Sequence, residues 1–252
     1  TMAPSRYAVV LAAGRGTRFH SSLPKVLHSL CGTPMLQHVL TRLGALTLSQ
    51  TLVVVGHQAE RVRQRFSGWP VTWVTQKQQR GTAHAVSMTR SHLHGKRGSV
   101  LVLHGDGPLI TSERLHDLLR TREQSGAALA LITSHLEDPK GYGRVIRTAG
   151  EPLRIVEEKD ATQEQQKIRE VNPGYYCFDV RRLFPVLDRV SDDNEQREYL
   201  LTDTVAILDR DALPVETVEA PAQEVLGVNN LQQLARAEAI LQDRIHRKRV
   251  DG

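Results

Sequence analysis

Residues 7–32 read YAVVLAAGRGTRFHSSLPKVLHSLCG, an apolar run followed by a long loop rich in glycine and basic side chains. The run over residues 7–12 is short and uninterrupted, which is typical of a buried strand in a parallel sheet. The loop over residues 13–32 carries Gly14, Gly16, Pro24 and Gly32 before the next helix can begin. In parallel α/β proteins the loop that follows such a strand is where ligands bind.

Strands and helices are predicted to alternate through the first half of the chain. Short apolar or β-branched runs predict strands over residues 51–55, 71–74, 99–104 and 127–133. Amphipathic stretches predict helices over residues 35–46, 58–66, 82–91 and 112–124. This alternation is typical of right-handed βαβ units, so we expect an α/β fold with a Rossmann-like, mostly parallel twisted sheet flanked by helices.

The second half of the chain has a different pattern. Short strands are predicted over residues 144–147, 153–156 and 215–218, and a longer strand over residues 171–180. Helices are predicted over residues 181–190, 201–210 and 231–248. We therefore expect a small β-rich lobe in this half, placed over the ligand-binding edge of the sheet.

Composition excludes several classes of protein. The chain has 252 residues, 40% of them hydrophobic, which is enough for the core of one domain. No apolar stretch approaches the ~20 residues of a membrane helix, and the N-terminus lacks the features of a signal peptide. We therefore expect a cytoplasmic protein without a membrane partner. The net charge is +5, but basic residues are dispersed and aromatic residues make up only 4%, which argues against a nucleic-acid partner.

The loop after the first strand has the chemistry of a phosphate site. Glycines allow close approach of the backbone, and Arg15, Arg18 and Lys25 add three positive charges within residues 15–25. A dinucleotide site is disfavoured because no third glycine stands at the spacing of that motif and no acidic residue ends the second strand. The GK[ST] of a Walker A loop is absent as well. A plain surface loop remains the alternative at this point.

Several motifs come in one order along the chain. LAAGRGTR (11–18) and LPK (23–25) are similar to the signature of the nucleotidyltransferase superfamily that activates sugar phosphates. The other motifs are GTAHA (81–85), GDGPLI (105–110), GYGRV (141–145), IVEEKDAT (155–162), Glu198-Tyr199 with Thr202-Asp203, and GVNN (227–230). Together they resemble the uridyltransferase (N-terminal) domain of the bacterial bifunctional N-acetylglucosamine-1-phosphate uridyltransferases/glucosamine-1-phosphate acetyltransferases. The resemblance runs from Tyr7 to about Arg249.

This resemblance implies a Mg²⁺-dependent enzyme that makes UDP-N-acetylglucosamine and pyrophosphate from UTP and N-acetylglucosamine 1-phosphate. It implies a nucleotidyltransferase domain over residues 5–230 and a C-terminal helix over residues 231–252 that leads to a downstream domain. In the family that domain is an acetyltransferase β-helix, which makes the trimer, so a homotrimer is expected only if the full-length protein has one. The sequence leaves open whether the chain is a piece of a bifunctional enzyme or a single-domain enzyme.

The resemblance also implies roles for individual residues. Arg15, Arg18 and Lys25 would be catalytic, and Asp106 and Asn229 would bind the metal, a set that suits Mg²⁺ because it takes few protein oxygens. The nucleotide would be bound by Leu11, Ala12, Gly14, Gln76, Gly81 and Thr82. The sugar would be bound by His104, Gly143, Glu157, Asn172 and Thr202.

Each of these assignments has a structural alternative. Asp106 could cap the following loop, and Asn229 could cap the helix predicted from residue 231. Gln76 could be an ordinary loop residue, and Glu157 could belong to a solvated charge run.

The chain departs from the family pattern at three positions near the expected sugar pocket. His104 stands where a tyrosine is usual, Gly107 where a valine is common, and Pro173 where a threonine or serine is usual. Another sugar 1-phosphate, another nucleotide, or a non-catalytic nucleotide-binding module therefore remain alternatives.

Overall fold

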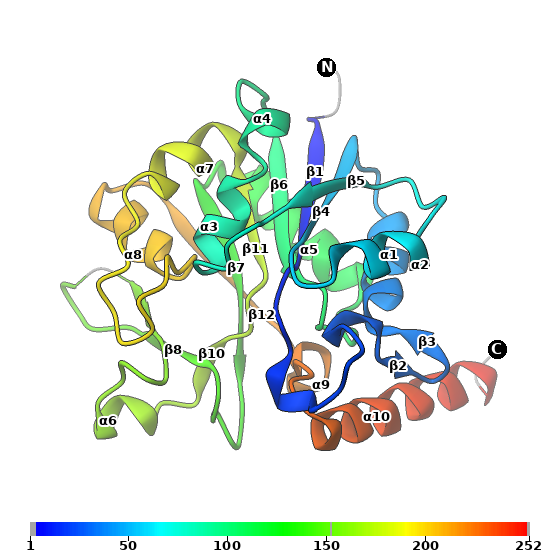
Figure 1. Cartoon of the computed structure of the whole chain (residues 1–252). Coiled ribbons are helices and arrows are strands. Elements are labelled where there is room, and N and C mark those ends of the chain that lie inside the picture. The colour runs from blue at the N-terminus through cyan, green and yellow to red at the C-terminus, as the bar shows by residue number, and fades with distance from the viewer. Residues whose placement is uncertain (1–3, 152, 251–252) are drawn as a thin grey trace.

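The computed structural model describes residues 4–151 and 153–250, and one twisted sheet organises them (Figure 1). Its first half is parallel, in the order β5-β4-β1-β6. These strands are β1 (Arg6–Ala12), β4 (Gln50–Val55), β5 (Thr72–Thr75) and β6 (Ser99–His104). The strands predicted for the first half of the chain are therefore confirmed, with ends that differ by one or two residues.

The sheet continues beyond β6 with strands from the second half of the chain. The order is β11-β7-β10-β8-β9, and β12 pairs with β7. Directions follow from the pairings: β1, β4, β5, β6, β7, β8 and β12 run one way, and β9, β10 and β11 run the other. The expected mostly parallel sheet is confirmed. The strands are β7 (Leu129–His135), β8 (Gly143–Ile146), β9 (Arg154–Val156), β10 (Glu170–Asn172), β11 (Tyr176–Asp179) and β12 (Val215–Glu219).

Helices cover both faces of the sheet (Figure 1). On one face lie α1 (Met35–Gly44), α2 (Ala59–Arg65) and α5 (Ser112–Ser125). On the other lie α3 (Thr82–Ser87), α4 (Arg90–Leu93), α7 (Val180–Leu187) and α8 (Asp203–Arg210). Three further helices are α6 (Gln163–Gln166), α9 (Ala222–Val225) and α10 (Leu231–Val250).

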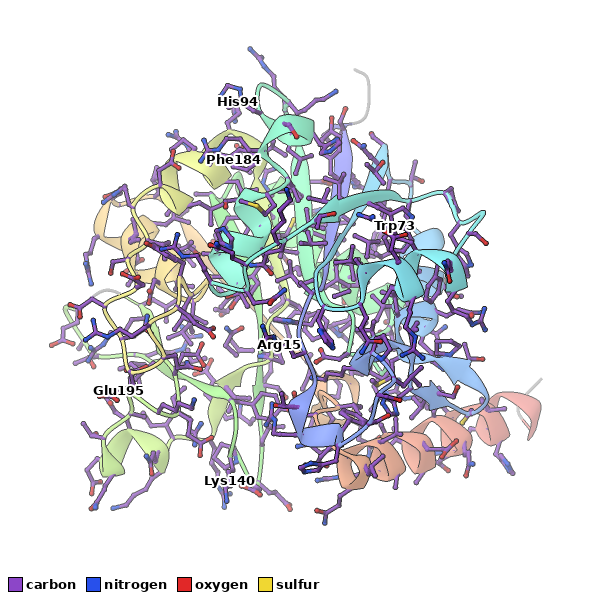
Figure 2. The ribbon with its side chains drawn as sticks, in the orientation of Figure 1. Arg15, Trp73, His94, Lys140, Phe184 and Glu195 are labelled. Carbon is purple, nitrogen blue, oxygen red and sulfur yellow. The ribbon has the colours of Figure 1, made fainter. Side chains whose placement is uncertain are left out.

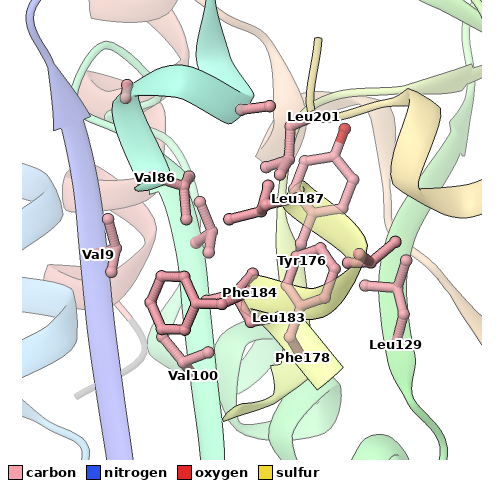
Figure 3. Packing of buried hydrophobic residues seen from close by; sticks show 14 of the residues in the cluster. Val9, Val86, Val100, Leu129, Tyr176, Phe178, Leu183, Phe184, Leu187 and Leu201 are labelled. Atoms are coloured by element: carbon pink, nitrogen blue, oxygen red, sulfur yellow. The ribbon is translucent and has the colours of Figure 1, made fainter. Parts of the chain in front are cut away.

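The alternation of side chains along each strand builds two cores, one on each face. In β1, Val9 points into one core and Val10 into the other. Figure 3 shows the first core, where Phe184 of α7 packs among residues of β1, β6 and α3. Because the central strands are buried on both sides, their sequences read as continuous apolar runs.

Two predicted elements are each divided in the structure. The helix expected over residues 82–91 is α3 followed by α4, because the hydroxyls of Ser87 and Thr89 bind carbonyls three residues back and compete with the helical ladder. The strand expected over residues 171–180 is β10 followed by β11. Between them Pro173 lacks a backbone N–H, and Gly174 adopts a φ of 88°.

The long loop predicted over residues 13–32 has regular elements of its own. It contains the short 3₁₀ helices η1 (Thr17–Phe19) and η2 (Lys25–Leu27), then the hairpin strands β2 (Ser29–Leu30) and β3 (Thr33–Pro34). A third apolar cluster joins this loop to α10, with Phe19 and Leu30 packed near Ala237 and Leu241. This cluster holds the loop against α10.

The expected β-rich lobe falls on the short strands β8, β9 and β10, which extend the sheet beyond β7. Its role as a substrate lobe stays a prediction, as does the division of the chain at residue 230. Among residues 4–151 and 153–250, no helix combines the length and apolar character that spanning a membrane requires.

Candidate active site

A cleft of ≈ 770 Å³ opens where β1, β5 and β6 end, and a smaller cavity of ≈ 280 Å³ adjoins it. Figure 2 shows Arg15 on the loop after β1, in the middle of the molecule, with Lys140 and Glu195 toward the end of the sheet that carries β8 and β10. This is the edge at which parallel sheets bind ligands, as the sequence predicted.

Every residue predicted for the site lines one of these two cavities. Only the larger cleft is lined by Leu11, Ala12, Gly14, Arg15, Arg18, Lys25, Gln76 and Gly81. Only the smaller cavity is lined by Gly143, Glu157, Asn172 and Thr202. Both are lined by Thr82, His104, Asp106 and Asn229. The residues predicted for nucleotide and for sugar thus lie in adjoining spaces, and the predicted metal ligands lie at their boundary.

Lys25 reaches that boundary from the larger cleft and lies between the two predicted metal ligands. Its Nζ forms an ion pair with Asp106 and donates to Asn229 Oδ1 at 2.7 Å. Arg18 donates to the same amide oxygen at 3.0 Å. Burial acts to raise the pKa of Asp106, but Lys25 and then His104 act against it and hold that pKa below the ordinary value. The carboxylate is therefore ionised in the folded protein at neutral pH.

The loop reaches this position because Gly16 adopts a φ of 64° and packs directly on Lys25. A Cβ on Gly16 would lie 2.6 Å from the Cβ of Lys25, a distance that side-chain atoms do not tolerate. Arg15 and Arg18, by contrast, are exposed along the rim. Gly16 thus allows the loop to pack closely on itself.

The neighbouring residue, not Asn229, caps the C-terminal helix. Asn230 Oδ1 accepts a hydrogen bond from the backbone of Gln233 at 2.8 Å, the contact expected of a helix cap. The side chain of Asn229 instead points to Lys25 and Arg18. The capping alternative for Asn229 is therefore wrong, and its amide oxygen faces the cleft.

The pair Asp106 and Asn229 fits a hard divalent cation. A carboxylate oxygen and an amide oxygen converge on one cationic atom, the Nζ of Lys25, so the geometry already holds a positive charge. Mg²⁺ prefers such oxygens and completes its shell with water and phosphate. Across residues 4–151 and 153–250, no group of three or more His, Cys, Asp or Glu side chains could hold a metal. An ion bound here would therefore take few ligands from the protein.

The smaller cavity offers hydrogen-bonding groups for a polar ligand. Thr202 donates to Glu157 Oε1 at 3.0 Å. Burial raises the pKa of Glu157, and the nearby Asp203 acts in the same direction. Gly143 lies against this carboxylate, since a Cβ there would lie 3.6 Å from Glu157 Oε2.

Asn172 is engaged within the protein as well as lining the cavity. Its amide nitrogen donates to the Tyr176 hydroxyl, and its oxygen accepts from the Gly174 N–H at 3.1 Å. The amide therefore braces the turn at Pro173. One amide hydrogen and one lone pair remain for a ligand.

Two departures from the family pattern, His104 and Gly107, each pack against a complementary neighbour. The ring of His104 lies over Gly174, where a Cβ would approach it to 2.6 Å, and burial lowers the pKa of this histidine. The hydroxyl of the fully buried Tyr175 lies against Gly107 and takes the space that a side chain at that position would need. The absence of a side chain at position 107 is thus matched by Tyr175.

Sequence reasoning missed some residues of the site. Glu198 lines both cavities. It stands in the motif Glu198-Tyr199, but it was not among the predicted site residues. Tyr142 lines the smaller cavity, and its hydroxyl accepts from the Gly227 N–H at 3.0 Å, which ties two distant loops together. Tyr142 lies inside the motif GYGRV, and this position in the motif is the sequence feature that could have indicated it as a site residue.

The fold and the cleft define a nucleotidyltransferase: a parallel sheet whose first strand ends in a glycine-rich basic loop, facing a carboxylate at the end of β6. Residues 8–206 match the family of MobA-like NTP transferase domains, and the chain belongs to this family.

Individual relatives agree with this class. The chain is 49% identical over 249 residues to the bifunctional protein GlmU of Heliobacterium modesticaldum, covering 98% of this chain and 54% of that protein. It is 44% identical over 247 residues to the bifunctional protein GlmU of Geobacillus thermodenitrificans, covering 97% of this chain and 54% of that protein. The chain thus spans about half the length of these relatives. The resemblance inferred from the motifs is confirmed.

Among solved structures, a UDP-glucose pyrophosphorylase complexed with UDP-glucose superimposes with a TM-score of 0.76. The comparison covers 95% of this chain and 99% of that one, at 16% sequence identity. At this identity the likeness establishes the fold alone.

Proposed function

We propose that this chain transfers a uridylyl group from UTP to N-acetylglucosamine 1-phosphate, with Mg²⁺ as cofactor, giving UDP-N-acetylglucosamine and pyrophosphate. The observation that carries the proposal is the convergence of Lys25, Asp106 and Asn229 at the boundary between the larger cleft and the smaller cavity. If the nucleotide binds in the larger cleft and the sugar phosphate in the smaller cavity, the uridylyl group is transferred where the two cavities meet. The resemblance carried by the sequence motifs supplies the substrate classes.

The reaction needs positioning and charge neutralisation more than acid–base chemistry. A sugar phosphate is already ionised at neutral pH, so its oxygen can attack the α-phosphorus of UTP in line without a protein nucleophile. The bond between the α-phosphorus and the bridging oxygen breaks, and pyrophosphate leaves with the electron pair. Arg15, Arg18 and Lys25 would bind the β- and γ-phosphates and stabilise the charge on this leaving group.

Asp106 and Asn229 would hold the magnesium ion at the boundary. When bound, Mg²⁺ would neutralise part of the negative charge of the phosphates that come together in the reaction. In the ligand-free protein Lys25 satisfies both oxygens. Lys25 must therefore leave them when they bind the metal, and the phosphates in the cleft are then the anions available to its ammonium group.

The smaller cavity would bind the amino-sugar. Glu157 and Thr202 offer an acceptor and a hydroxyl to the sugar hydroxyls, and Asn172 keeps one amide hydrogen free for the same purpose. His104 reaches both cavities and would contact the sugar near its phosphate.

The test is pyrophosphate release with Mg²⁺, scanning UTP, dTTP, CTP and GTP against glucose 1-phosphate, glucosamine 1-phosphate and N-acetylglucosamine 1-phosphate. A strong preference for UTP with the N-acetylated sugar is the expected result. Turnover of UTP with a different sugar would overturn the sugar assignment and attribute the change to His104 and Pro173. No turnover of any pair by folded protein would favour a non-catalytic nucleotide-binding module.

A further inference from the structure

His84 is a partly buried polar group that the proposed mechanism does not use. It lies on α3 behind the larger cleft and does not line it; instead it lines a separate surface cavity beside Arg80 and Tyr199. Its Nδ1 is 2.9 Å from the side-chain nitrogen of Gln76, which does line the cleft and is only 3% exposed. His84 therefore touches the expected base-binding amide from behind.

The hydrogen bonds around Gln76 fix which way its amide points. The Gln76 nitrogen also donates to the backbone carbonyl of Gly81 at 3.1 Å. A carbonyl can only accept, so the atom that faces it must be the NH₂ group and not the amide oxygen. Both amide hydrogens are then used, one on Gly81 and one on His84.

This arrangement also fixes the tautomer of His84. Because the Gln76 NH₂ group can only donate, the Nδ1 of His84 must be the unprotonated ring nitrogen. The nearby Gln78 backbone acts to raise the pKa of His84. Burial, followed by the Arg80 guanidinium, outweighs it and lowers that pKa, so the neutral ring is the stable form at neutral pH.

The amide oxygen of Gln76 is the group left to meet a ligand in the cleft. An oxygen is a pure acceptor, so it matches a base edge that carries an N–H. Uracil has an N–H at ring position 3, whereas cytosine has a bare nitrogen acceptor there. Thymine shares the N–H of uracil, so this contact separates uridine from cytidine nucleotides and not from thymidine nucleotides.

We infer that His84 is a positioning residue that holds the Gln76 amide with its oxygen toward the base, and so favours uridine over cytidine nucleotides. The inference rests on the proposed function, because it assigns the base specificity of the same cleft. His84 acts through Gln76 and touches no substrate. His84 disfavours the flipped orientation of the Gln76 amide, in which the NH₂ group instead of the oxygen would face the base.

The variants His84→Ala and His84→Asn test the inference, with the dissociation constants of UTP and CTP measured by calorimetry. Asparagine can place an oxygen near the position of Nδ1 and accept from Gln76, whereas alanine cannot. We expect the preference of the wild type for UTP over CTP to fall about fivefold in His84→Ala, as loss of one neutral hydrogen bond predicts, and to be largely retained in His84→Asn. Thermal unfolding of both variants checks that the fold is intact.

An unchanged preference in His84→Ala would overturn the inference, as would an equal loss in both variants. Direct observation of the tautomer by ¹⁵N NMR gives a readout that does not depend on activity. The expected spectrum has an unprotonated Nδ1 and a protonated Nε2 at His84, and the opposite tautomer would overturn the inference.

These outcomes separate the inference from the proposed function. If folded wild-type protein transfers no nucleotide, the proposed function fails, while the binding preference and the tautomer still decide the role of His84. If the wild type transfers uridylyl groups but binds CTP as tightly as UTP, the proposed reaction stands and the inference fails.

Discussion

Replacing Lys25 with alanine should have opposite effects on turnover and on metal binding. Lys25 is the cation that contacts both Asp106 and Asn229 in the ligand-free protein. Its removal takes away a positive charge aimed at the leaving pyrophosphate, and the loss of one such group lowers turnover by about 10²–10³-fold. The same substitution frees the Asp106 and Asn229 oxygens. A divalent ion then no longer has to displace the ammonium group in order to bind them.

The size of the effect on metal binding follows from these contacts. A hydrogen bond to a charged group contributes about 1.5–3 kcal/mol, so nucleotide-free Lys25→Ala should bind Mn²⁺ about tenfold more tightly or better. The side chains of Lys25 and Asp106 are 12% and 22% exposed, so solvent screens the pair only in part. We expect the variant to fold, with a stability loss of about 1–3 kcal/mol, below the cost of breaking a fully buried pair.

The pH dependence of stability should change in the same variant. In the wild type the pKa of Asp106 is held below its ordinary value, so this carboxyl stabilises the fold above the pKa of the unfolded chain. That contribution is lost as the pH falls through the lowered folded pKa. Without Lys25 the effect of burial is less opposed, so the acid-side loss of stability in Lys25→Ala should be smaller than in the wild type.

Calorimetry or electron paramagnetic resonance with Mn²⁺, together with steady-state kinetics, measures both effects. Arg15→Ala is the matched control, because it removes a cation from the same loop but not from Asp106 or Asn229. It should lower turnover and leave Mn²⁺ affinity in the absence of nucleotide unchanged. Unchanged or weaker Mn²⁺ binding by Lys25→Ala would refute the metal site, and near-wild-type turnover would remove Lys25 from the mechanism.

Four further substitutions have expected outcomes. Asp106→Ala should abolish Mg²⁺-dependent pyrophosphate release while urea unfolding still shows a folded protein; unchanged Mg²⁺ kinetics would exclude Asp106 as a ligand. Gly107→Ala should destabilise the protein by about 1–3 kcal/mol, because the new Cβ meets the buried Tyr175, whose Cζ lies 3.1 Å away and whose hydroxyl is closer. Tyr175→Phe should recover most of that loss, and a full penalty in the Phe background would contradict the explanation. Glu157→Gln should raise the KM for the sugar phosphate about tenfold or more. It should not lower stability at neutral pH, because a carboxyl with a raised folded pKa costs stability once the pH exceeds its unfolded value.

The sheet could be predicted because its central strands are buried on both faces. The runs that became β1, β4 and β6 are continuous and apolar, and Gly14, Gly56 and Gly105 follow them, so both their type and the binding edge could be derived from the sequence. The divided elements could not be predicted in the same way. The break at Pro173 depends on β10 pairing with β7 and β8 while β11 inserts between β6 and β7.

The residues of the site were predicted mainly from the family resemblance, and their arrangement needed the structure. Lys25 and Asn229 are 204 residues apart in the chain, and nothing in the local pattern indicates that their side chains meet. Local rules also failed to separate Asn229 from Asn230, since both precede the same helix and both are good caps. Only the packing of α10 against the loop after β1 decides which one faces the cleft.

The most direct test of the account follows labelled phosphorus from UTP in the presence of Mg²⁺ and N-acetylglucosamine 1-phosphate. With UTP labelled at the α-phosphorus, the account predicts that all transferred label is found in UDP-N-acetylglucosamine. With UTP labelled at the γ-phosphorus, the label should be found in pyrophosphate. Transfer of the γ-label to the sugar, or α-label that leaves with the pyrophosphate fraction, would contradict attack at the α-phosphorus and with it the proposed reaction.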